Sequence, residues 1–384
     1  MAHDADNVVR ICHTGGLTRR IDALSSDEMG EAEATQWRAR PTMRDVAALA
    51  KVSIKTVSRV VNDESGVAPD MVARVRRAMD RLDYRPDFAA SALRRTHRRS
   101  ATIGMLLDDL ANPFAAAVHR AVEDVARDRG VLVLAGSSDG AIERERSLVA
   151  TFTSRRVDAL VIMPTGPDHS YLVNERRSGT PMVFIDRPPV FLDADAVVVD
   201  NVDGTRRGVQ HLLTHGHHRI AFLGDLQSIP TAKQRYEGYV AELRAHGRTV
   251  EPGHVVLGLR GIEGAEEAVT RLLAAADPPT ALFTAQNLLT IGAVRALRRA
   301  NRHRDIALVG FDDILLADLL DPAITVIAQD AHRIGQKSAE VLFRRLDGDR
   351  SPSDHHVIPT RLITRGSGEI GPAPDSPRAA RRAR

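Results

Sequence analysis

Cysteine is almost absent from this chain: Cys12 is the single one in 384 residues, so no intramolecular disulfide and no thiolate metal cluster can form. Long apolar runs are absent as well, and none approaches the ~18–20 consecutive apolar residues of a membrane-spanning helix. The first residues carry charges at Asp4, Asp6 and Arg10, where a signal peptide has its apolar stretch. We therefore expect a protein that stays in the cytoplasm and has no membrane partner.

Motifs of the common catalytic classes are missing too. The sequence has no glycine-rich phosphate loop, no Gly-x-Ser-x-Gly elbow and no paired Cys and His, so we expect neither an enzyme nor a bound cofactor. His215, His217 and His218 stand close together, but no Cys or carboxylate accompanies them at ligand spacing. This cluster predicts a turn between a helix and a strand, and no metal site is expected.

Negative charge is scarce in one segment of the chain. Residues 40–100 hold 14 Lys and Arg against 7 Asp and Glu, whereas the rest of the chain holds 39 and 43. A basic segment attached to a mildly acidic body is typical of a nucleic-acid-binding module joined to another domain. Charge alone fits a solvated basic surface equally well.

From Thr42 onward the apolar spacing predicts three short helices. Thr42 and Asp45 have the spacing of a capping box, Ser53 can cap a second helix, and Pro69 opens a third. Three short helices with a tight turn between the first two are typical of a helix-turn-helix bundle, which we place at residues 41–86.

From Thr102 onward, short apolar segments alternate with amphipathic helical patterns, which predicts parallel sheets covered on both faces. The strands are too many for one open sheet, so we expect two similar lobes that face a cleft. The predicted fold class is α/β: an all-α helix-turn-helix headpiece followed by a two-lobed α/β domain with parallel sheets. The expected strands are 102–107, 131–135, 159–163, 182–185, 196–199, 220–223, 281–283, 306–311 and 325–327.

These patterns divide the chain into five segments. The first residues show no sustained period, and the last ones are rich in Pro, Ala and Arg, so both ends are expected to be disordered. The expected boundaries are 1–40 for the extension, 41–86 for the headpiece, 87–100 for a hinge helix or linker, 101–368 for the two-lobed domain with lobe boundaries near 200–203 and 326–330, and 369–384 for the tail.

Several strings of residues occur together along the chain. They include Arg44-Asp45-Val46-Ala47, Thr56-Val57-Ser58-Arg59-Val60-Val61-Asn62, Tyr84-Arg85-Pro86, Asn112-Pro113-Phe114, Phe184-Ile185-Asp186-Arg187 and Gly310-Phe311-Asp312-Asp313. Together they closely resemble the LacI/GalR family of repressors, over roughly residues 41–368. The resemblance implies a periplasmic-binding-protein-like body that binds a small effector, commonly a sugar or nucleoside, and that dimerises.

The second helix of a helix-turn-helix lies in the major groove with its first residues against base edges. Ile54, Lys55 and Arg59 are therefore expected to contact bases, because Lys and Arg suit guanine and Ile suits a thymine methyl. Short polar side chains are better placed for phosphate oxygens; the candidates are Thr42, Ser53, Thr56, Ser58 and Asn62. The structural alternatives are plain helix capping by Thr42 and Ser53, and a solvated surface at Lys55 and Arg59.

The resemblance also implies a hinge helix over Asp87–Arg94 that enters the minor groove. In family members a leucine matching Leu93 wedges into a central base step, while residues matching Ala89 and Ala92 let two such helices approach closely. A helix of this length is marginal in water, so we expect it to form only when something holds it.

The resemblance places the effector between the two lobes. Most matching residues follow the carboxyl ends of expected strands, where ligands bind open α/β sheets. The expected effector-binding residues are Asp108, Asn112, Phe114, Asp186, Arg187, Arg235, Gln286, Asn287, Asp312 and Gln329. This mix suits a sugar-like ligand. Arg260 lies near the place where many sugar-binding members have an aromatic residue, and Gln286 stands where Asn is common, so a phosphorylated sugar is an alternative.

The expected partners are double-stranded operator DNA, a small-molecule effector and a second copy of the chain. A homodimer matches the two half-sites of a roughly palindromic operator, and the tail lacks the leucine heptads that make some relatives tetrameric. The resemblance implies a repressor whose effector shifts the population of lobe arrangements. Two alternatives are a solute-binding protein, which the missing signal peptide disfavours, and a regulator controlled by a partner protein.

Overall fold

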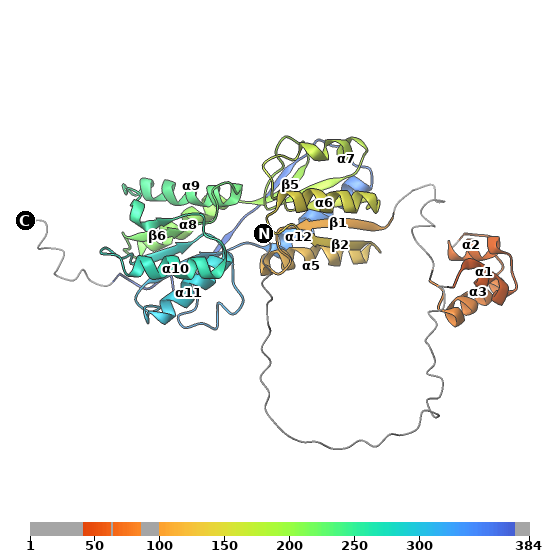
Figure 1. Ribbon diagram of the computed structural model, residues 1–384, viewed down its shortest axis with the longest axis horizontal. Helices are drawn as coiled ribbons and strands as arrows, with labels where there is room; N and C mark the ends of the chain where they lie inside the picture. The colour runs from red at the N-terminus through yellow and green to blue at the C-terminus, as the bar shows by residue number, and fades with distance from the viewer. Residues whose placement is uncertain (1–40, 63, 86–99, 373–384) are drawn as a thin grey trace, which may run out of the picture. The chain divides into compact units, whose positions relative to one another are not determined.

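The computed structural model describes residues 41–62, 64–85 and 100–372, which fall into two compact units divided after residue 87. Figure 1 shows both units, and each is described by itself. The extension predicted over 1–40 and the hinge helix with Ala89 and Leu93 lie outside the described residues. Within the described part of the chain, no helix combines the length and the apolar character that a membrane span requires.

The first unit is a bundle of three helices, α1 (Met43–Ala50), α2 (Ile54–Val61) and α3 (Pro69–Leu82). The predicted capping box is confirmed: the Thr42 N–H donates to Asp45 Oδ2 at 2.7 Å, and the Asp45 N–H donates back to Thr42 Oγ1 at 3.4 Å. The side chain of Ser53 caps α2, and Pro69 stands at the start of α3. Buried aliphatic side chains from all three helices form one small core.

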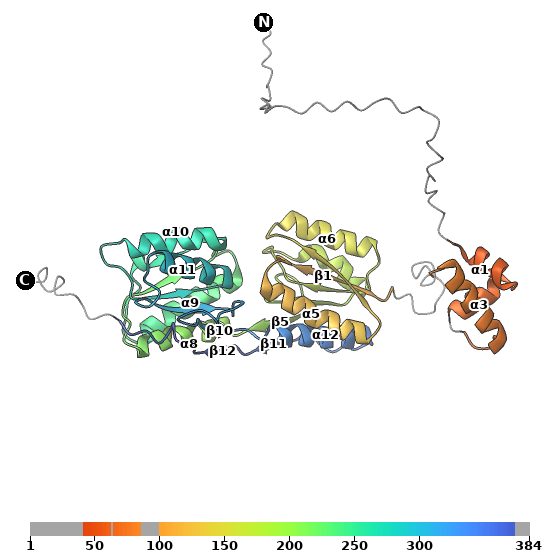
Figure 2. The same ribbon diagram turned by 90° about the horizontal axis from the view of Figure 1, so that it is seen from below.

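The second unit consists of two lobes, each an α/β layer structure, which confirms the predicted fold class (Figure 2). Lobe 1 contains β1 (Thr102–Leu107), α5 (Pro113–Asp128), β2 (Leu132–Ser137), α6 (Ile142–Ser154), β3 (Ala159–Ile162), α7 (Val173–Arg177), β4 (Met182–Ile185), β5 (Asp195–Val199), α12 (Ala331–Leu346) and β11 (His355–Ile358). Lobe 2 contains α8 (Asn201–Thr214), β6 (Ile220–Leu223), α9 (Pro230–Ala245), β7 (Val255–Val256), α10 (Gly261–Leu273), β8 (Ala281–Thr284), α11 (Asn287–Arg299), β9 (Ala307–Phe311), β10 (Thr325–Ala328) and β12 (Arg361–Ile363).

The two sheets share one strand order. It is β11-β5-β4-β3-β1-β2 in lobe 1 and β12-β10-β9-β8-β6-β7 in lobe 2, so each lobe places its first strand beside its second and third. All described strand pairs are parallel except β10 with β12. Parallel strands need crossover helices, and helices then cover both faces of the sheet.

Alternating side chains of the lobe 1 sheet pack into two cores. Ile103 and Met105 point to the face covered by α5 and α12, whereas Leu106 points to the face covered by α6. Lobe 2 repeats the arrangement, with α8 and α9 on one face and α10 and α11 on the other. Since both faces of each sheet are buried, its central strands are apolar throughout, which explains the continuous apolar runs in the sequence.

The chain crosses between the lobes three times. It passes to lobe 2 after β5, returns after β10 to form α12, and passes again to lobe 2 between β11 and β12. The third crossing was not predicted, because β11 and β12 are short and half exposed and therefore show little apolar pattern.

The structure places the first four residues of the tail predicted over 369–384. Residues 369–372 are described, and Glu369 accepts hydrogen bonds from Thr325 Oγ1 at 2.9 Å and from the Gly366 N–H at 2.6 Å. The carbonyl oxygen of Ile370 lies 2.6 Å from His217 Nε2. These contacts fix the segment against lobe 2, so the boundary at 369 was wrong, while residues from 373 onward lie outside the described part.

Glycines let three helix pairs pack with their backbones close together. A Cβ built on Gly238 of α9 would stand 2.5 Å from the carbonyl oxygen of Val202 in α8, and one on Gly335 of α12 would stand 2.5 Å from that of Val118 in α5. Gly292 of α11 lies equally close to α10. At these crossings even a methyl group would collide with the neighbouring backbone, which cannot move aside as a side chain can.

Candidate nucleic-acid interface and ligand cleft

Helix α2 buries one face and leaves the predicted base-reading face in solvent. Val57 and Val60 lie in the headpiece core, whereas Ile54 is 45% exposed and Lys55 is exposed. A large aliphatic side chain gains nothing from exposure at the start of a helix. Ile54 and Lys55 are therefore free to contact another molecule.

The polar residues predicted to contact phosphates also hold the helix ends. Ser53 Oγ accepts from the Thr56 N–H at 3.0 Å, and the two hydroxyls lie 2.9 Å apart. Asn62 Nδ2 lies 3.4 Å from Ser58 Oγ. The capping alternative for Thr42 and Ser53 is thus present in the structure. To contact a phosphate oxygen a hydroxyl must donate its hydrogen: Ser53 can do so while it accepts from the Thr56 N–H, whereas the Thr42 hydroxyl must first leave Asp45. Phosphate contact by these residues stays a prediction.

Arg59 does not point freely into solvent, contrary to the expectation for a base-reading donor. Its Nη2 donates to the carbonyl oxygen of Ser65, and its Nε lies 3.6 Å from a carboxylate oxygen of Glu64. The loop after α2 offers unpaired acceptors beside the helix, which the sequence pattern does not reveal. Arg59 must leave these contacts before it can reach a base.

The sequence analysis missed Arg74, which stabilises the turn between α1 and α2. From α3, its Nη2 donates to the carbonyl oxygens of Ala50 at 2.6 Å and Lys51 at 3.1 Å. These carbonyls end α1, where Lys51 takes a left-handed conformation with φ 52°. Arg74 therefore fixes the tight turn that sets α2 against α1.

The predicted effector-binding residues come together in the second unit. One cavity of about 650 Å³, open to solvent, lies between the carboxyl edges of the two sheets. All ten predicted residues line it: Asp108, Asn112, Phe114, Asp186 and Arg187 from lobe 1, and Arg235, Gln286, Asn287, Asp312 and Gln329 from lobe 2.

The lobe 1 wall of this cleft is organised by Arg187. Its guanidinium group donates to Asp186 Oδ2 at 3.2 Å, to the carbonyl oxygen of Pro164 at 2.8 Å and to Asp108 Oδ2 at 3.3 Å. Asp186 follows β4 in a left-handed conformation, φ 67°, which turns its side chain out of the sheet and into the cleft. Most donors of Arg187 are therefore already used by the protein.

The lobe 2 wall has the same design around Arg235. This buried guanidinium donates to Asn201 Oδ1 and to the carbonyl oxygen of Ala285, both at 2.8 Å, and stacks on the Phe311 ring at 3.9 Å. Asp312 follows β9 with φ 71°, as Asp186 follows β4. The two walls thus present one carboxylate each at matching places.

The surroundings of Asp312 raise the pKa of its carboxyl group above the ordinary value. Burial raises the pKa of Asp312, and the nearby carboxylate of Asp186 adds to the rise. Arg235 and the Gln329 side chain, which donates to Asp312 Oδ1 at 2.5 Å, act in the opposite direction. A ligand that donates hydrogen bonds to both carboxylates would relieve their repulsion.

Two amides link the lobes across the cleft. Asn287 Nδ2 donates to Asn112 Oδ1 at 2.8 Å, and Asn112 Nδ2 lies 3.5 Å from Asn287 Oδ1. Asn112 caps α5 and Asn287 begins α11, so the amino ends of two helices meet there. Arg260 of lobe 2 also reaches lobe 1, with Nη2 3.6 Å from the place of a Cβ on Gly140.

Some lining residues were missed in the sequence. Asp225 stands two residues after the end of β6 and accepts from Gln286 Nε2 at 3.3 Å, while Asp109 and Thr231 complete the rim. A polar residue just after a strand was the available signal for Asp225. With these residues, five Asp and two Arg line the cavity, and none of the described residues around it is Lys or His.

Two family models match the chain. That of the bacterial regulatory proteins of the lacI family matches residues 42–87, and that of the periplasmic binding protein-like domain matches residues 209–368. The first spans the helix bundle, and the second spans most of lobe 2 and the return into lobe 1.

Individual proteins are similar over most of their length. The ribose operon repressor of Escherichia coli strain K12 is 32% identical over 332 residues, which cover 85% of this chain and 99% of that protein. A crystal structure of the Lac repressor dimer bound to operator and the anti-inducer ONPF has a TM-score of 0.76 at 27% identity, covering 86% of this chain and 99% of that one. A regulator from Enterococcus faecium with bound ribose has a TM-score of 0.63 at 26% identity, covering 71% of this chain and 100% of that one.

Proposed function

This chain belongs to the lacI family of bacterial regulatory proteins, and from that premise we propose that it is a repressor that reads operator DNA with its headpiece and senses a small ligand in its cleft. The observation that carries the proposal is the convergence of ten polar and aromatic residues on one interlobe cavity, in a chain that also has an exposed recognition face on α2. A repressor must reach the chromosome, so its place of action is the cytoplasm. No catalytic step is assigned to it.

We propose that Ile54 and Lys55 carry most of the sequence reading. Both lie in the first turn of α2 and are exposed, whereas Arg59 is engaged with the loop that follows. Thr42, Ser53, Thr56, Ser58 and Asn62 are proposed to position the helix on the phosphate backbone. Such contacts fix the register of the protein on DNA and carry no sequence information.

Replacing Lys55 with alanine should weaken operator binding much more than binding to random duplex. A bidentate contact to a base is worth about 1–3 kcal/mol, which corresponds to roughly 5- to 150-fold in the dissociation constant. Titrations of selected operator and of scrambled duplex at one fixed salt concentration measure both effects.

Arg81→Ala is the matched control, because it removes one positive charge from an exposed position near the end of α3. We expect this variant to lose a similar, small amount of affinity for both duplexes. Equal behaviour of the Lys55 and Arg81 variants would show that Lys55 contributes only charge.

We propose that the effector is a neutral polyhydroxylated molecule. Both cleft arginines are occupied by protein acceptors, while five carboxylates line the cavity, so the site offers acceptors to hydroxyl groups and little to a phosphate. The relatives named for ribose, or solved with ribose bound, support this class. The phosphorylated sugar considered from the sequence is thereby the weaker candidate.

A neutral pentose should stabilise the protein against heat more than its phosphate ester does, once the Tm shift caused by inorganic phosphate at the same concentration has been subtracted from the shift with the ester. A ligand at 100 times its dissociation constant adds about 2.7 kcal/mol, and for a domain of this size that raises Tm by roughly 5–10 °C. Thermal denaturation with ribose and with ribose 5-phosphate compares the two directly.

A larger shift with the phosphate ester would contradict the neutral class. If neither these two compounds nor a wider set of sugars and nucleosides changed Tm, control by a partner protein would become the better proposal for the cleft-bearing unit.

We propose that the chain acts as a homodimer, with a leucine-rich loop of lobe 2 in the interface. Leu315, Leu316 and Leu319 follow β9 and are 81%, 55% and 74% exposed. Three exposed leucines on one loop form an apolar patch typical of a protein contact. The Lac repressor among the similar structures is a dimer on its operator.

The effector can act only through a difference in its affinity for two lobe arrangements. The amide pair Asn112 and Asn287 contributes to one of them, and both residues line the ligand cavity. We propose that ligand contact with these amides changes the balance between arrangements and, through the linkers, the hold of the headpieces on DNA.

A further inference from the structure

A second cavity lies at the opposite edge of lobe 1 from the effector cleft. It is open to solvent, its volume is about 590 Å³ including solvent at the mouth, and Met182 and Asp195, the first residues of β4 and β5, form part of its lining. The linker joins lobe 1 at this same edge, where the Ser100 N–H donates to Asp158 Oδ1 at 2.6 Å just before β1. We call it the linker edge. β4 is two strands from β1, a distance of about 10 Å.

The charged groups on the floor of this cavity are already hydrogen-bonded or ion-paired with other parts of the protein. Arg345 donates to both carboxylate oxygens of Asp195, at 2.8 and 2.9 Å, and to the carbonyl oxygens of Ser351 and Pro352 at 2.5 and 2.8 Å. Asp349 lies 2.9 Å from the Nε of Arg344. The charges of the partly buried Arg345 and of the two carboxylates in the cavity lining are therefore neutralised by the protein itself.

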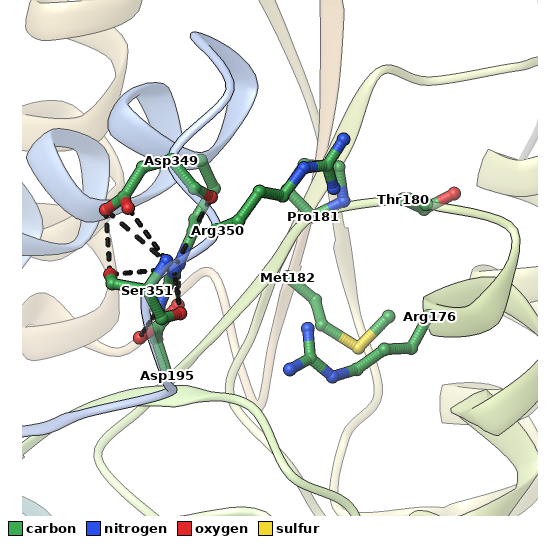
Figure 3. Close-up of a pocket in the computed structure, with 10 residues that line it drawn as sticks. Arg176, Thr180, Pro181, Met182, Asp195, Asp349, Arg350 and Ser351 are labelled. Carbon is green, nitrogen blue, oxygen red and sulfur yellow. Dashed lines mark hydrogen bonds and ion pairs between the residues drawn. The ribbon is translucent and has the colours of Figure 1, made fainter.

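Two further arginines reach over the cavity from opposite walls (Figure 3). Arg176 extends from α7, where its Nη2 donates to Ser353 Oγ at 3.0 Å and lies 3.4 Å from Asp193, a side chain that is 83% exposed. Arg350 extends from the loop before β11, is exposed, and forms no ion pair within the described residues. Like charges that face one cavity repel each other unless an anion lies between them.

We propose that this cavity binds a phosphate group between Arg176 and Arg350. Guanidinium groups bind phosphate oxygens through paired hydrogen bonds, and two of them match the charge of a phosphate dianion. The phosphate belongs either to a free phosphorylated molecule or to the backbone of bound DNA, and its position beside the linker lets it influence DNA binding independently of the effector cleft.

A purely structural role for these arginines makes a different prediction. α7 and α12 both end at the linker edge, and cations near helix carboxyl ends are stabilising by themselves. In that case removing Arg350 would change stability by the same amount whether phosphate is present or not. The response to phosphate therefore separates ligand binding from helix stabilisation.

Thermal denaturation of the full chain in inorganic phosphate and in chloride, at equal ionic strength, tests the free-phosphate source. At ten times the dissociation constant, phosphate should raise Tm of the unsubstituted protein by about 3–6 °C beyond its general salt effect. Arg350→Gln and Arg176→Gln should lose this increment. Arg177→Gln is the matched control, because Arg177 is exposed at the same edge and does not line the cavity.

Operator titrations from 50 to 200 mM salt test the DNA source. If a backbone phosphate occupies the cavity, the slope of log affinity against log salt should fall by about 0.9 per protomer in Arg350→Gln relative to Arg177→Gln. Loss of the phosphate-dependent rise in Tm supports a site for a free phosphorylated molecule. A reduced slope supports a site for a phosphate of the DNA backbone. If Arg350→Gln and Arg177→Gln behave alike in both measurements, the proposal is wrong.

Discussion

Gly238→Ala should lower the free energy of unfolding of the two-lobed unit by about 3 kcal/mol, the upper part of the usual range for overpacking. The added methyl would stand 2.5 Å from the carbonyl oxygen of Val202 and 2.9 Å from Thr205 Cβ, so α8 and α9 must separate. In an unhindered helix the same change is stabilising by up to about 1 kcal/mol, because alanine is the better helix former. Urea unfolding followed by circular dichroism measures the difference.

Gly264→Ala is the control for this experiment. Gly264 lies in α10, and the nearest atom to a Cβ there, Leu259 Cδ2, is 4.0 Å away. This variant should be as stable as the parent protein or slightly more stable. If Gly238→Ala also unfolded at the parental urea concentration, the helix crossing would be looser than the structure indicates.

Asp186→Asn should weaken effector binding by roughly 10- to 150-fold and leave operator binding without effector unchanged. Hydrogen bonds to a charged acceptor contribute about 1.5–3 kcal/mol. Asparagine keeps the shape of the side chain, tolerates the left-handed backbone at this position, φ 67°, and keeps an oxygen that can accept from Arg187 Nε. The measurement is the affinity for labelled operator as a function of effector concentration.

Asp109→Asn is the matched change at the rim of the same cleft, where the carboxylate is exposed. Solvent screens an exposed group, so this variant should respond to effector almost as the parent does. A full response of Asp186→Asn would mean that the effector binds elsewhere. A loss of operator binding in the absence of effector would instead point to damage to the fold.

The parts of the site that depend on local sequence were predictable. Nine of the ten cleft residues follow strand ends or begin helices, the exception being Arg235 inside α9, and parallel topology brings all such ends to one edge of each sheet. The caps at Thr42, Ser53 and Pro69 depend only on residue types a few positions apart. Resemblance to a family supplied the role of each cleft residue, which spacing alone did not.

The parts that depend on tertiary contacts were not predictable. The turn after α1 is held by Arg74, 24 positions from Ala50, and the loop before β11 is held by Arg345 through Asp195, 150 positions away. Arg59 was interpreted as a free donor because its acceptors, Glu64 and Ser65, belong to an irregular loop. The short strands β11 and β12 gain their pairing from distant partners and carry little signal of their own.

The discontinuous lobe 1 has a consequence for synthesis on the ribosome. Its first five strands are complete when β5 ends at Val199, but α12 and the edge strand β11 emerge only as the chain approaches Ile358. At about 5–20 residues per second, the interval is on the order of 10 s. During this interval the three helices of the headpiece have already been translated, while the sheet of lobe 1 still lacks α12 and β11. The DNA-binding unit is therefore complete before the ligand-binding unit that controls it.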